Sequence, residues 1–421
     1  MKRIKVLPGI LLLLLLFCSC APVKGGGPGT NTTAAGPENQ GSGSESPSTT
    51  TGEPVETERD PLRIQLDGMS VDEKIGQLLF FGFDGMAPDE QALDMISRYR
   101  PGGLIIMGAN VESSSQLAKL VDALKAGTEK YGIPAFIGVD EEGGRVSRMP
   151  PELKDMPAAL KVGKTGDPGH AEGMGRVIAE ELKAFGFNMD FAPVLDIWSN
   201  PKNTVIGDRA FGTDPETVGK MGIPVMKGLA DGGIIPVVKH FPGHGNTVAD
   251  SHKELPVSDS GVERLKSFEL KPFEEAVASG ADAVMIAHIL LEQVDDQYPA
   301  SLSKAVITDL LRNQMGFDGV VITDDMTMGA IAKNYGLEEA AVKAVQAGCD
   351  LLLVVHGYDR EAQVAESLKN AVQNGEISEE RLDESVYRIL RLKEKYGLTN
   401  TPVGAVDVKR LNSEIDRFLK N

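Results

Sequence analysis

Residues 319–328 read GVVITDDMTM, a short apolar run rich in β-branched side chains that ends in two adjacent carboxylates. A run of this length and composition predicts a buried strand. Similar runs recur along the chain, and the strands expected from them cover residues 78–83, 103–107, 135–140, 188–197, 236–240, 283–288, 319–324 and 350–355. The sequence thus predicts eight buried strands.

Longer amphipathic stretches separate the expected strands. Helical periodicity is found at residues 113–131, 170–185, 216–230, 263–278, 337–347 and 379–396. Ser70 with Glu73 predicts a capping box on a leading helix. Strands that alternate with helices form parallel sheets, so the repeats within residues 61–400 predict an α/β fold, the (β/α)8 TIM barrel, as a single catalytic domain. An open doubly wound sheet is the alternative, but no GxGxxG motif follows the first strand.

The composition excludes several classes of protein. The chain has 421 residues and 43 Lys plus Arg against 61 Asp plus Glu, with a formal net charge of -18. Nucleic-acid binders neutralise phosphates with clustered Lys and Arg, so no nucleic-acid partner is expected. Three Cys residues are too few for a disulfide scaffold or a Cys-rich zinc site.

The first twenty residues predict export. Basic residues at positions 2, 3 and 5 precede an apolar run at residues 10–17, which is shorter than a bilayer span and typical of a signal peptide over residues 1–19. The sequence Ser19-Cys20-Ala21 resembles a bacterial lipobox, although Phe17 stands where Leu is usual. This resemblance implies that Cys20 is lipidated and anchors the protein to the cell membrane, facing outside the cytoplasm.

Two further segments flank the expected barrel. Residues 20–60 are dominated by Gly, Ser, Thr and Pro and lack large apolar side chains, so we expect a disordered tether. Residues 401–421 are expected to form a C-terminal tail with a short helix.

Histidines gather where the expected strands end. Five of the six His lie at or just after the carboxyl end of an expected strand: His240, His244, His252, His288 and His356. The active site of a (β/α)8 barrel lies on this face, so the grouping indicates catalysis. Taken singly, His288 and His356 fit a structural role equally well.

Side chains suited to catalysis are most concentrated in residues 239–252, KHFPGHGNTVADSH. Asp250 and His252 are two residues apart, a spacing that lets the carboxylate reach the imidazole, orient it and stabilise its protonated form. A metal site formed by His240, His244 and Asp250 or His252 is the competing interpretation. It is the weaker one because a zincin requires HExxH on a helix, and Pro and Gly interrupt this segment.

Carboxylates and arginines follow three other strands. Successive side chains of a strand point to opposite faces, so one of Asp324 and Asp325 can enter the barrel mouth as a nucleophile while the other serves as a helix N-cap. Residues 138–148, GVDEEGGRVSR, end a strand with a carboxylate and add two Arg. Residues 206–214, IGDRAFGTD, supply Arg209, a side chain suited to bidentate binding.

Together, KHFPGHG followed by DSH, DEEGGRVSR and TDDMTM resemble glycoside hydrolase family 3, specifically its bacterial β-N-acetylglucosaminidase branch, over about residues 65–398. The resemblance implies that Asp324 is the nucleophile and His252 the acid/base, with Asp250 as its partner. It also implies sugar-binding roles for Asp140, Arg148, Arg209, Lys239 and His240.

The residue types support this chemistry on their own. A retaining glycosidase needs a carboxylate nucleophile and a proton donor that later acts as a base. An imidazolium beside an ionised Asp is attractive, whereas two close carboxylates require one raised pKa, so both reactive forms coexist near neutral pH. We therefore expect no metal ion and no organic cofactor.

The resemblance implies hydrolysis of terminal non-reducing β-linked N-acetylglucosamine, with muropeptides from peptidoglycan as the substrate. We expect a monomer whose barrel alone forms the site and which meets the membrane only through its lipid anchor. A β-glucosidase or a glycoside phosphorylase of the same family is the first alternative. A metal-dependent barrel hydrolase and a tethered sugar-binding lipoprotein are the others.

Overall fold

The computed structural model describes residues 60–247 and 249–420. The predicted signal peptide, Cys20 and all of the predicted tether except Asp60 lie outside the described residues. No helix in the described part of the chain has the length and apolarity needed to cross a bilayer.

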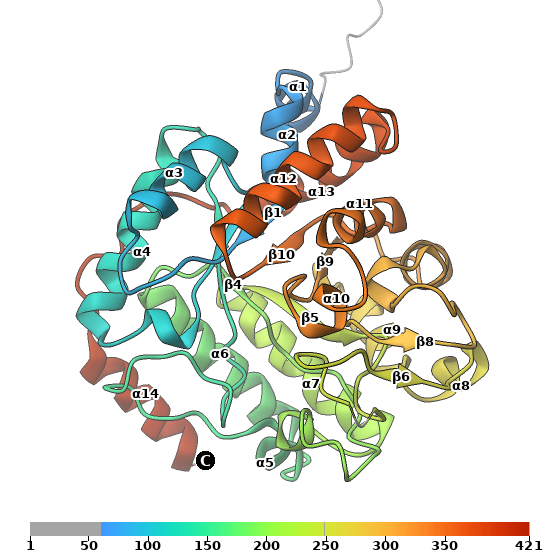
Figure 1. Cartoon of the computed structure of the whole chain (residues 1–421). Coiled ribbons are helices and arrows are strands. Elements are labelled where there is room, and N and C mark those ends of the chain that lie inside the picture. The colour runs from blue at the N-terminus through green and yellow to red at the C-terminus, as the bar shows by residue number, and fades with distance from the viewer. Residues whose placement is uncertain (1–59, 248, 421) are drawn as a thin grey trace, which may run out of the picture. The chain divides into compact units, whose positions relative to one another are not determined.

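Eight parallel strands form the centre of the molecule (Figure 1). They are β1 (Leu79–Phe81), β2 (Gly103–Ile105), β3 (Phe136–Val139), β4 (Met189–Asp190), β5 (Ile235–Phe241), β7 (Ala283–Ile286), β9 (Val320–Thr323) and β10 (Leu352–Val354). Each pairs in parallel with its neighbour in the order β10-β1-β2-β3-β4-β5-β7-β9. A parallel bridge between Ile322 and Leu351 joins the last strand to the first, so the predicted (β/α)8 barrel is confirmed.

Helices cover the outside of the barrel. Those that follow the strands or close the fold are α3 (Glu90–Tyr99), α4 (Ser114–Glu129), α6 (Pro168–Ala184), α7 (Pro215–Asp231), α9 (Lys271–Ala278), α11 (Leu337–Ala347), α12 (Tyr358–Gln373) and α13 (Glu379–Lys395). A π-helix, Ala305–Gln314, occupies the position between β7 and β9. Shorter elements are α1 (Pro61–Asp67), α2 (Val71–Gln77), α5 (Ala159–Gly163), α8 (Val262–Ser267), α10 (Gly329–Ala332), the 3-10 turns 108–110, 207–209 and 300–302, and a small sheet of β6 (Val257–Ser258) and β8 (Leu290–Leu291).

Local signals account for where several elements begin and break. Ser70 and Glu73 form the expected capping box on α2. The helix expected at 263–278 is instead two helices, α8 and α9, separated at residues 268–270. Pro272 lies in the first turn of α9, where its missing N–H costs nothing, whereas within one continuous helix it would remove a hydrogen bond.

The barrel interior is filled by aromatic rings. Phe80 lies 6.4 Å from the ring of Phe136 and 5.5 Å from that of Phe191, measured between centroids. A Cβ added at Gly103 would come within 2.4 Å of the Phe80 ring, and one at Gly138 within 2.8 Å. The two glycines therefore leave the space that Phe80 occupies, and the site must lie above this packed layer.

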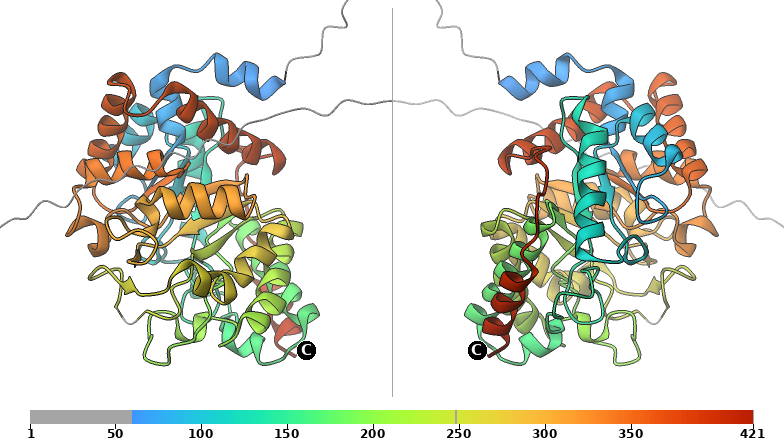
Figure 2. Two further views of the ribbon diagram at one scale, coloured as in Figure 1. Left: turned by 90° about the vertical axis from the view of Figure 1, so that its right-hand side faces the viewer. Right: turned by 90° about the vertical axis from the view of Figure 1, so that its left-hand side faces the viewer.

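A C-terminal helix, α14 (Val408–Lys420), packs on the outside of α6 (Figure 2). Its Leu411, Ile415 and Phe418 are buried, and the Phe418 ring stacks on His170 with centroids 4.4 Å apart. The Asn412 side chain binds the main chain of the loop between β3 and α5: its Oδ1 accepts from Lys154 N at 2.8 Å and its Nδ2 donates to Glu152 O at 2.8 Å. This helix therefore supports the loop that contains Arg148.

Candidate active site

A pocket of about 340 Å³ opens at the carboxyl ends of the barrel strands. Seven of the eight predicted catalytic and sugar-binding residues line it: Asp140, Arg148, Arg209, Lys239, His240, His252 and Asp324. Asp250 is described by the structure but is not one of the lining residues. Residues that are separated by up to 184 positions in sequence thus meet because parallel strands end on one face.

Two cations and two carboxylates form a charged network at the pocket: Lys239, Arg209 and Asp140 line it, and the buried Glu142 binds both cations. Lys239, at the end of β5, places Nζ 2.6 Å from Asp140 Oδ1 and 2.6 Å from Glu142 Oε1. Arg209 binds Glu142 in bidentate fashion, with two N–O distances of 2.7 Å. Burial opposes ionisation of Glu142, but the charges of Arg209 and Lys239 hold its pKa well below the usual range. This network, called the charged wall below, is therefore permanently charged.

Asp196 binds two histidines at the carboxyl end of β5: His240, within the strand, and His244, just after it. Its Oδ2 lies 2.6 Å from His240 Nδ1, and its Oδ1 accepts a hydrogen bond from His244 N at 2.5 Å. Asp196 is fully buried, yet the nearby His240 charge and hydrogen bond outweigh burial and lower its pKa. Because Nδ1 is bound to Asp196, His240 presents Nε2 to the pocket, 3.4 Å from Arg209.

The two adjacent carboxylates after β9 have different surroundings. Asp325 Oδ1 accepts from Thr327 N at 2.9 Å and Val355 N at 3.1 Å, and Asp325 Oδ2 accepts from the Thr327 hydroxyl at 2.6 Å. Asp324 Oδ1 accepts one hydrogen bond, from Asp325 N at 2.8 Å. Burial works to raise the pKa of Asp324, but its interactions with the His288 and His240 rings and the hydrogen bond from Asp325 N outweigh burial and lower this pKa. Asp325 anchors the turn, and Asp324 is an ionised carboxylate on the pocket wall.

His288 lies directly beneath this turn and is fully buried. Its Nε2 donates to Asp325 O at 3.0 Å, and its Nδ1 lies 2.6 Å from Ser301 Oγ. Burial lowers the pKa of His288, which favours the neutral ring. Of the two readings open for this residue, the structure supports the structural one.

His252 is exposed and lines the pocket from the loop between β5 and β6. Asp250 Oδ1 accepts from the main-chain N of His252 at 3.0 Å, and Asp250 Oδ2 lies 3.4 Å from Lys253 Nζ. The carboxylate thus shapes the backbone turn that carries the imidazole. Contact between Asp250 and the imidazole itself stays a prediction.

Arg148 faces the same pocket from the loop after β3. Its guanidinium donates to Ser147 O at 3.2 Å, and its main-chain N donates to Glu141 Oε2 at 2.9 Å. Glu141 itself is buried, and burial raises its pKa to about 7. Arg148 is thus a third cation that lines the pocket, and it forms no ion pair within 4.0 Å among the described residues.

Two residues of this network were not predicted as site residues, Glu142 and Asp196. Glu142 is the last of three consecutive acidic residues, and the sequence alone did not indicate which of them binds Arg209 and Lys239. Asp196 stands near the end of the fourth expected strand, so its position at that face was the available signal. Its pairing with His240 depends on contact between neighbouring strands.

The described residues contain no group of three or more His, Cys, Asp or Glu side chains arranged to hold a metal ion. The ring nitrogens of His244 lie near Thr247 Oγ1 at 2.7 Å and Ser251 Oγ at 3.3 Å. Burial lowers the pKa of His244. In this arrangement His240 and His244 are held by protein groups.

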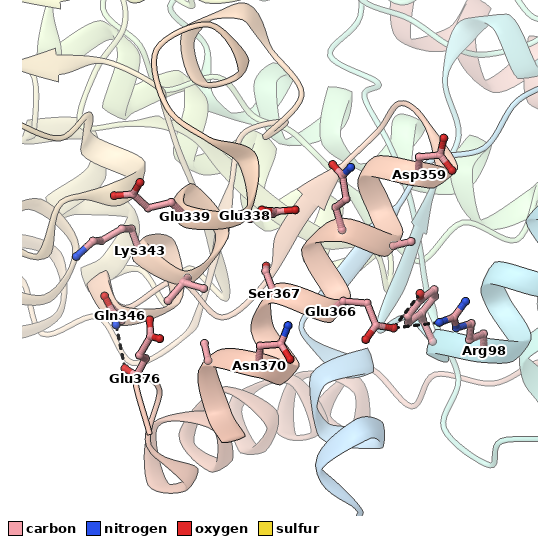
Figure 3. A pocket seen from close by; sticks show the side chains of 15 residues that line it. Arg98, Glu338, Glu339, Lys343, Gln346, Asp359, Glu366, Ser367, Asn370 and Glu376 are labelled. Carbon is pink, nitrogen blue, oxygen red and sulfur yellow. Dashed lines mark hydrogen bonds and ion pairs between the residues drawn. The ribbon is translucent and has the colours of Figure 1, made fainter. Parts of the chain in front are cut away.

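A larger hollow, about 850 Å³, lies outside the barrel between α3, α11 and α12 (Figure 3). Its walls carry charges of both signs, among them Arg98, Lys343, Asp359 and Glu366. It is lined mainly by helix surfaces on the outside of the barrel, and the predicted site residues line the smaller pocket instead. Size alone therefore does not locate the active site.

The smaller pocket combines three chemical capacities. Asp324 supplies an ionised carboxylate, His252 supplies an exposed imidazole that can carry a proton, and the charged wall supplies donors and acceptors for hydroxyl groups. A carboxylate nucleophile with a separate proton donor matches the two groups needed for glycoside hydrolysis with retention.

Comparisons with known proteins agree with this chemistry. Residues 70–392 match the model of the glycosyl hydrolase family 3 N terminal domain. Beta-hexosaminidase A of Pseudoalteromonas piscicida is 32% identical over 76% of this chain, which spans 59% of that relative's length. Beta-hexosaminidase LpqI of Mycobacterium tuberculosis is 35% identical over 77% of this chain and 83% of its own.

A solved structure is similarly close. A glycoside hydrolase family 3 beta-N-acetylglucosaminidase from Paenibacillus sp. str. FPU-7 matches with a TM-score of 0.79 and 40% identity, over 83% of this chain and 68% of that chain. The family model covers most of the described barrel, including every residue that lines the pocket. The chain therefore belongs to glycosyl hydrolase family 3.

Proposed function

We propose that the protein is a retaining exo-β-N-acetylhexosaminidase that removes terminal non-reducing β-linked N-acetylglucosamine. The observation that carries the proposal is the meeting of Asp324 and His252 in one pocket with the charged wall. The names of the relatives support the choice of sugar. The packed aromatic layer closes the pocket from below, which favours binding of a chain end.

In the first step, Asp324 attacks the anomeric carbon while His252 protonates the leaving oxygen. The lowered pKa of Asp324 supports an ionised nucleophile at neutral pH. In the second step, neutral His252 removes a proton from water, which hydrolyses the glycosyl-enzyme ester and releases the sugar. The same imidazole thus serves as acid and then as base.

The charged wall binds the sugar in this proposal. Asp140, Lys239 and Arg209 offer charge-assisted hydrogen bonds to hydroxyl groups, which are stronger than neutral ones. Arg148 and His240 Nε2 complete the set. Asp250 holds the His252 turn and, in the proposed reaction, supports the imidazolium that forms.

The natural substrate we propose is a muropeptide derived from peptidoglycan. Residues 1–19 would direct export, Cys20 would carry the lipid, and residues 20–60 would tether the catalytic domain of residues 61–400 outside the cytoplasmic membrane. The tail of residues 401–421, which includes α14, completes the domain. We propose that the protein acts as a monomer.

The test is release of p-nitrophenol by the full chain from the N-acetyl-β-glucosaminide and the β-glucoside, with EDTA and phosphate as variables. We expect turnover of the N-acetyl substrate alone, unaffected by EDTA or phosphate. Loss with EDTA would favour a metal-dependent hydrolase, a requirement for phosphate would favour a phosphorylase, and binding without turnover would favour a sugar-binding lipoprotein.

Asp324→Asn should reduce kcat by roughly a thousandfold or more, since removal of a nucleophile leaves only binding and positioning effects. The matched control is Asp359→Asn, which makes the same change in the larger outer hollow and should keep full activity. Activity that survives in Asp324→Asn, or is lost in Asp359→Asn, would contradict the assignment.

A further inference from the structure

The loop that carries His252 is held to the barrel by three consecutive carbonyl groups. Ser251 O accepts from Ala330 N at 3.1 Å, and His252 O accepts from Gly329 N at 3.2 Å. Lys253 O accepts from Lys333 Nζ at 2.7 Å. All three donors belong to residues 329–333, so one short segment binds all three carbonyl groups of the loop.

The loop offers these carbonyls together because it forms a single helical turn. Lys253 N and Glu254 N donate to Asp250 O at 2.9 and 3.0 Å, and Asp250 Oδ1 caps the turn through His252 N at 3.0 Å. Carbonyl groups at the end of such a turn point in one direction. They meet the free N–H groups at the start of α10.

Gly329 allows this close approach. A Cβ at position 329 would lie 2.8 Å from His252 O, 2.8 Å from Lys253 O and 2.9 Å from Lys253 C, all of them main-chain atoms. Its backbone has no left-handed torsion, so an alanine could adopt the conformation. Alanine would even favour α10 by about 1 kcal/mol. The glycine is therefore required for contact with the loop and not for the shape of the helix.

The same segment also carries the proposed nucleophile. Asp324 directly follows β9, five residues before Gly329, and Asp325 ties the intervening turn to Thr327 and to Val355, the residue after β10. Docking of the His252 loop on this segment therefore fixes the position of the His252 imidazole relative to Asp324.

We propose that Gly329 is a positioning residue for proton transfer: its missing side chain lets the loop of residues 250–254 dock on α10 and holds His252 at the glycosidic oxygen. The proposal rests on the function proposed above. Lys333 reinforces the docking from outside the pocket.

The test compares Gly329→Ala with the wild type on aryl N-acetyl-β-glucosaminides that have good and poor leaving groups. A displaced acid matters most when the leaving oxygen needs a proton. We expect kcat/KM to fall by about tenfold or more for a phenol leaving group and by less than about threefold for 2,4-dinitrophenol. Lys333→Met, which removes one hydrogen bond without a steric clash, should give a smaller loss with the same dependence on the leaving group.

Gly336→Ala is the matched control, because a Cβ at position 336 meets nothing within 4 Å. It should leave both substrates unaffected. An equal loss on both leaving groups in Gly329→Ala, or no loss, would overturn the proposal. A thermal midpoint well below that of Gly336→Ala would assign the effect to folding instead and would also count against it.

Hydrogen exchange separates this proposal from the proposed function. In Gly329→Ala, amides of residues 249–255 should exchange faster than in the wild type, while those of β9 stay protected. If the wild-type protein hydrolyses no N-acetyl-β-glucosaminide, the proposed function fails, and faster loop exchange would still support the docking. Unchanged exchange would contradict the docking itself.

Discussion

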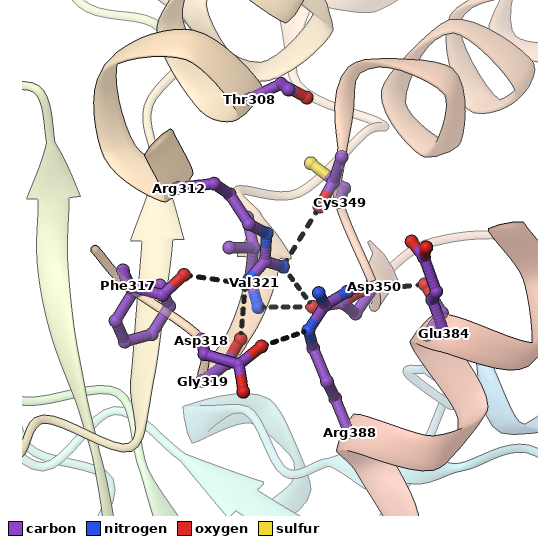
Figure 4. Close-up of polar contacts among 12 residues, drawn as sticks. Thr308, Arg312, Phe317, Asp318, Gly319, Val321, Cys349, Asp350, Glu384 and Arg388 are labelled. Carbon is purple, nitrogen blue, oxygen red and sulfur yellow. Dashed lines mark hydrogen bonds and ion pairs between the residues drawn. The ribbon is translucent and has the colours of Figure 1, made fainter. Parts of the chain in front are cut away.

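The two ends of the barrel each bury a carboxylate among cations, but they use it differently. At the carboxyl end, Glu142 lies between Arg209 and Lys239, and both cations line the pocket. At the opposite end, the Asp350 carboxylate lies 2.5 Å from Arg312 and 3.4 Å from Arg388 (Figure 4). It also lies 3.3 Å from Arg381.

At this opposite end, called the lower end below, the arginines bind main-chain groups of the protein as well as Asp350. Arg312 also donates to Gly319 O at 2.7 Å and Gly348 O at 3.2 Å, and Arg381 donates to Cys349 O at 2.8 Å. Asp350 also accepts from Ser385 Oγ at 2.7 Å and from Val321 N at 3.0 Å. A buried charge cluster is thus a poor marker of a site unless some of its groups face a pocket.

Breaking the lower cluster should give the largest loss of stability. Asp350→Asn removes the buried carboxylate that three guanidinium groups share and leaves Arg312 without its ion-pair partner, so we expect the free energy of unfolding to fall by about 3–5 kcal/mol. The measurement is chemical denaturation. Asp318→Asn is the control, since Asp318 binds Arg388 and Arg391 but is 66% exposed, and it should cost less than about 1 kcal/mol.

Activity distinguishes the two ends further. Folded Asp350→Asn should keep the kcat/KM of the wild type, because the cluster lies across the barrel from the pocket. A change in kcat/KM larger than the change in folded fraction would contradict the separation of the two ends.

Breaking the upper cluster should reduce substrate binding. Glu142→Gln removes the ionised anchor of Arg209 and one carboxylate partner of Lys239. We expect kcat/KM to fall by about 100-fold, or about 2.7 kcal/mol, with a raised KM. The control is Asp155→Asn in the exposed part of the same loop. Unchanged KM in Glu142→Gln would show that the wall does not bind the sugar.

Two buried lysines, one at each end of the barrel, have pKa values that are shifted in opposite directions. Lys239 has two carboxylate partners, which outweigh burial and raise its pKa. Lys393, at the lower end, has Gln77 Oε1 at 2.8 Å and the Phe136 ring at 4.8 Å, and burial lowers its pKa to about 7. A neutral Lys393 is therefore accessible near physiological pH.

Lys393 should make stability depend on pH. Between about pH 7 and pH 10, the unfolded chain holds a proton on this lysine that the folded chain has released, so stability increases as pH rises. The unfolding free energy of the wild type minus that of Lys393→Met should rise by about 1.4 kcal/mol per pH unit from pH 7.5 to 9.5, because only the wild type has this titrating group. Parallel pH curves for the two proteins would contradict the lowered pKa of Lys393.

Much of this architecture could be read from the sequence. Apolar β-branched runs located all eight strands, because strands buried on both faces have a continuous apolar pattern. Knowing that parallel strands end on one face was enough to expect that Asp140, His240 and Asp324 would be neighbours. The resemblance to family 3 then selected among the charged residues on that face.

The remaining details depend on turns and on distant packing. Gly143 and Gly144 have positive φ angles, 75° and 59°, and the turn they form directs Glu142 toward Arg209. The periodicity of a strand ends before such a turn, so it could not select Glu142. The contact of Asp250 with the His252 backbone is likewise a property of one local turn, and the docking of α14 joins residues 258 positions apart.

That helix has a consequence for how the protein matures. Asn412 supports the loop after β3, yet α14 leaves the ribosome only after all eight strands have been synthesised. Because a nascent chain folds from its N-terminus onward, we expect the barrel to close before this loop gains its outer support. Final placement of the loop that carries Arg148 would then be among the last steps in the maturation of the newly made protein.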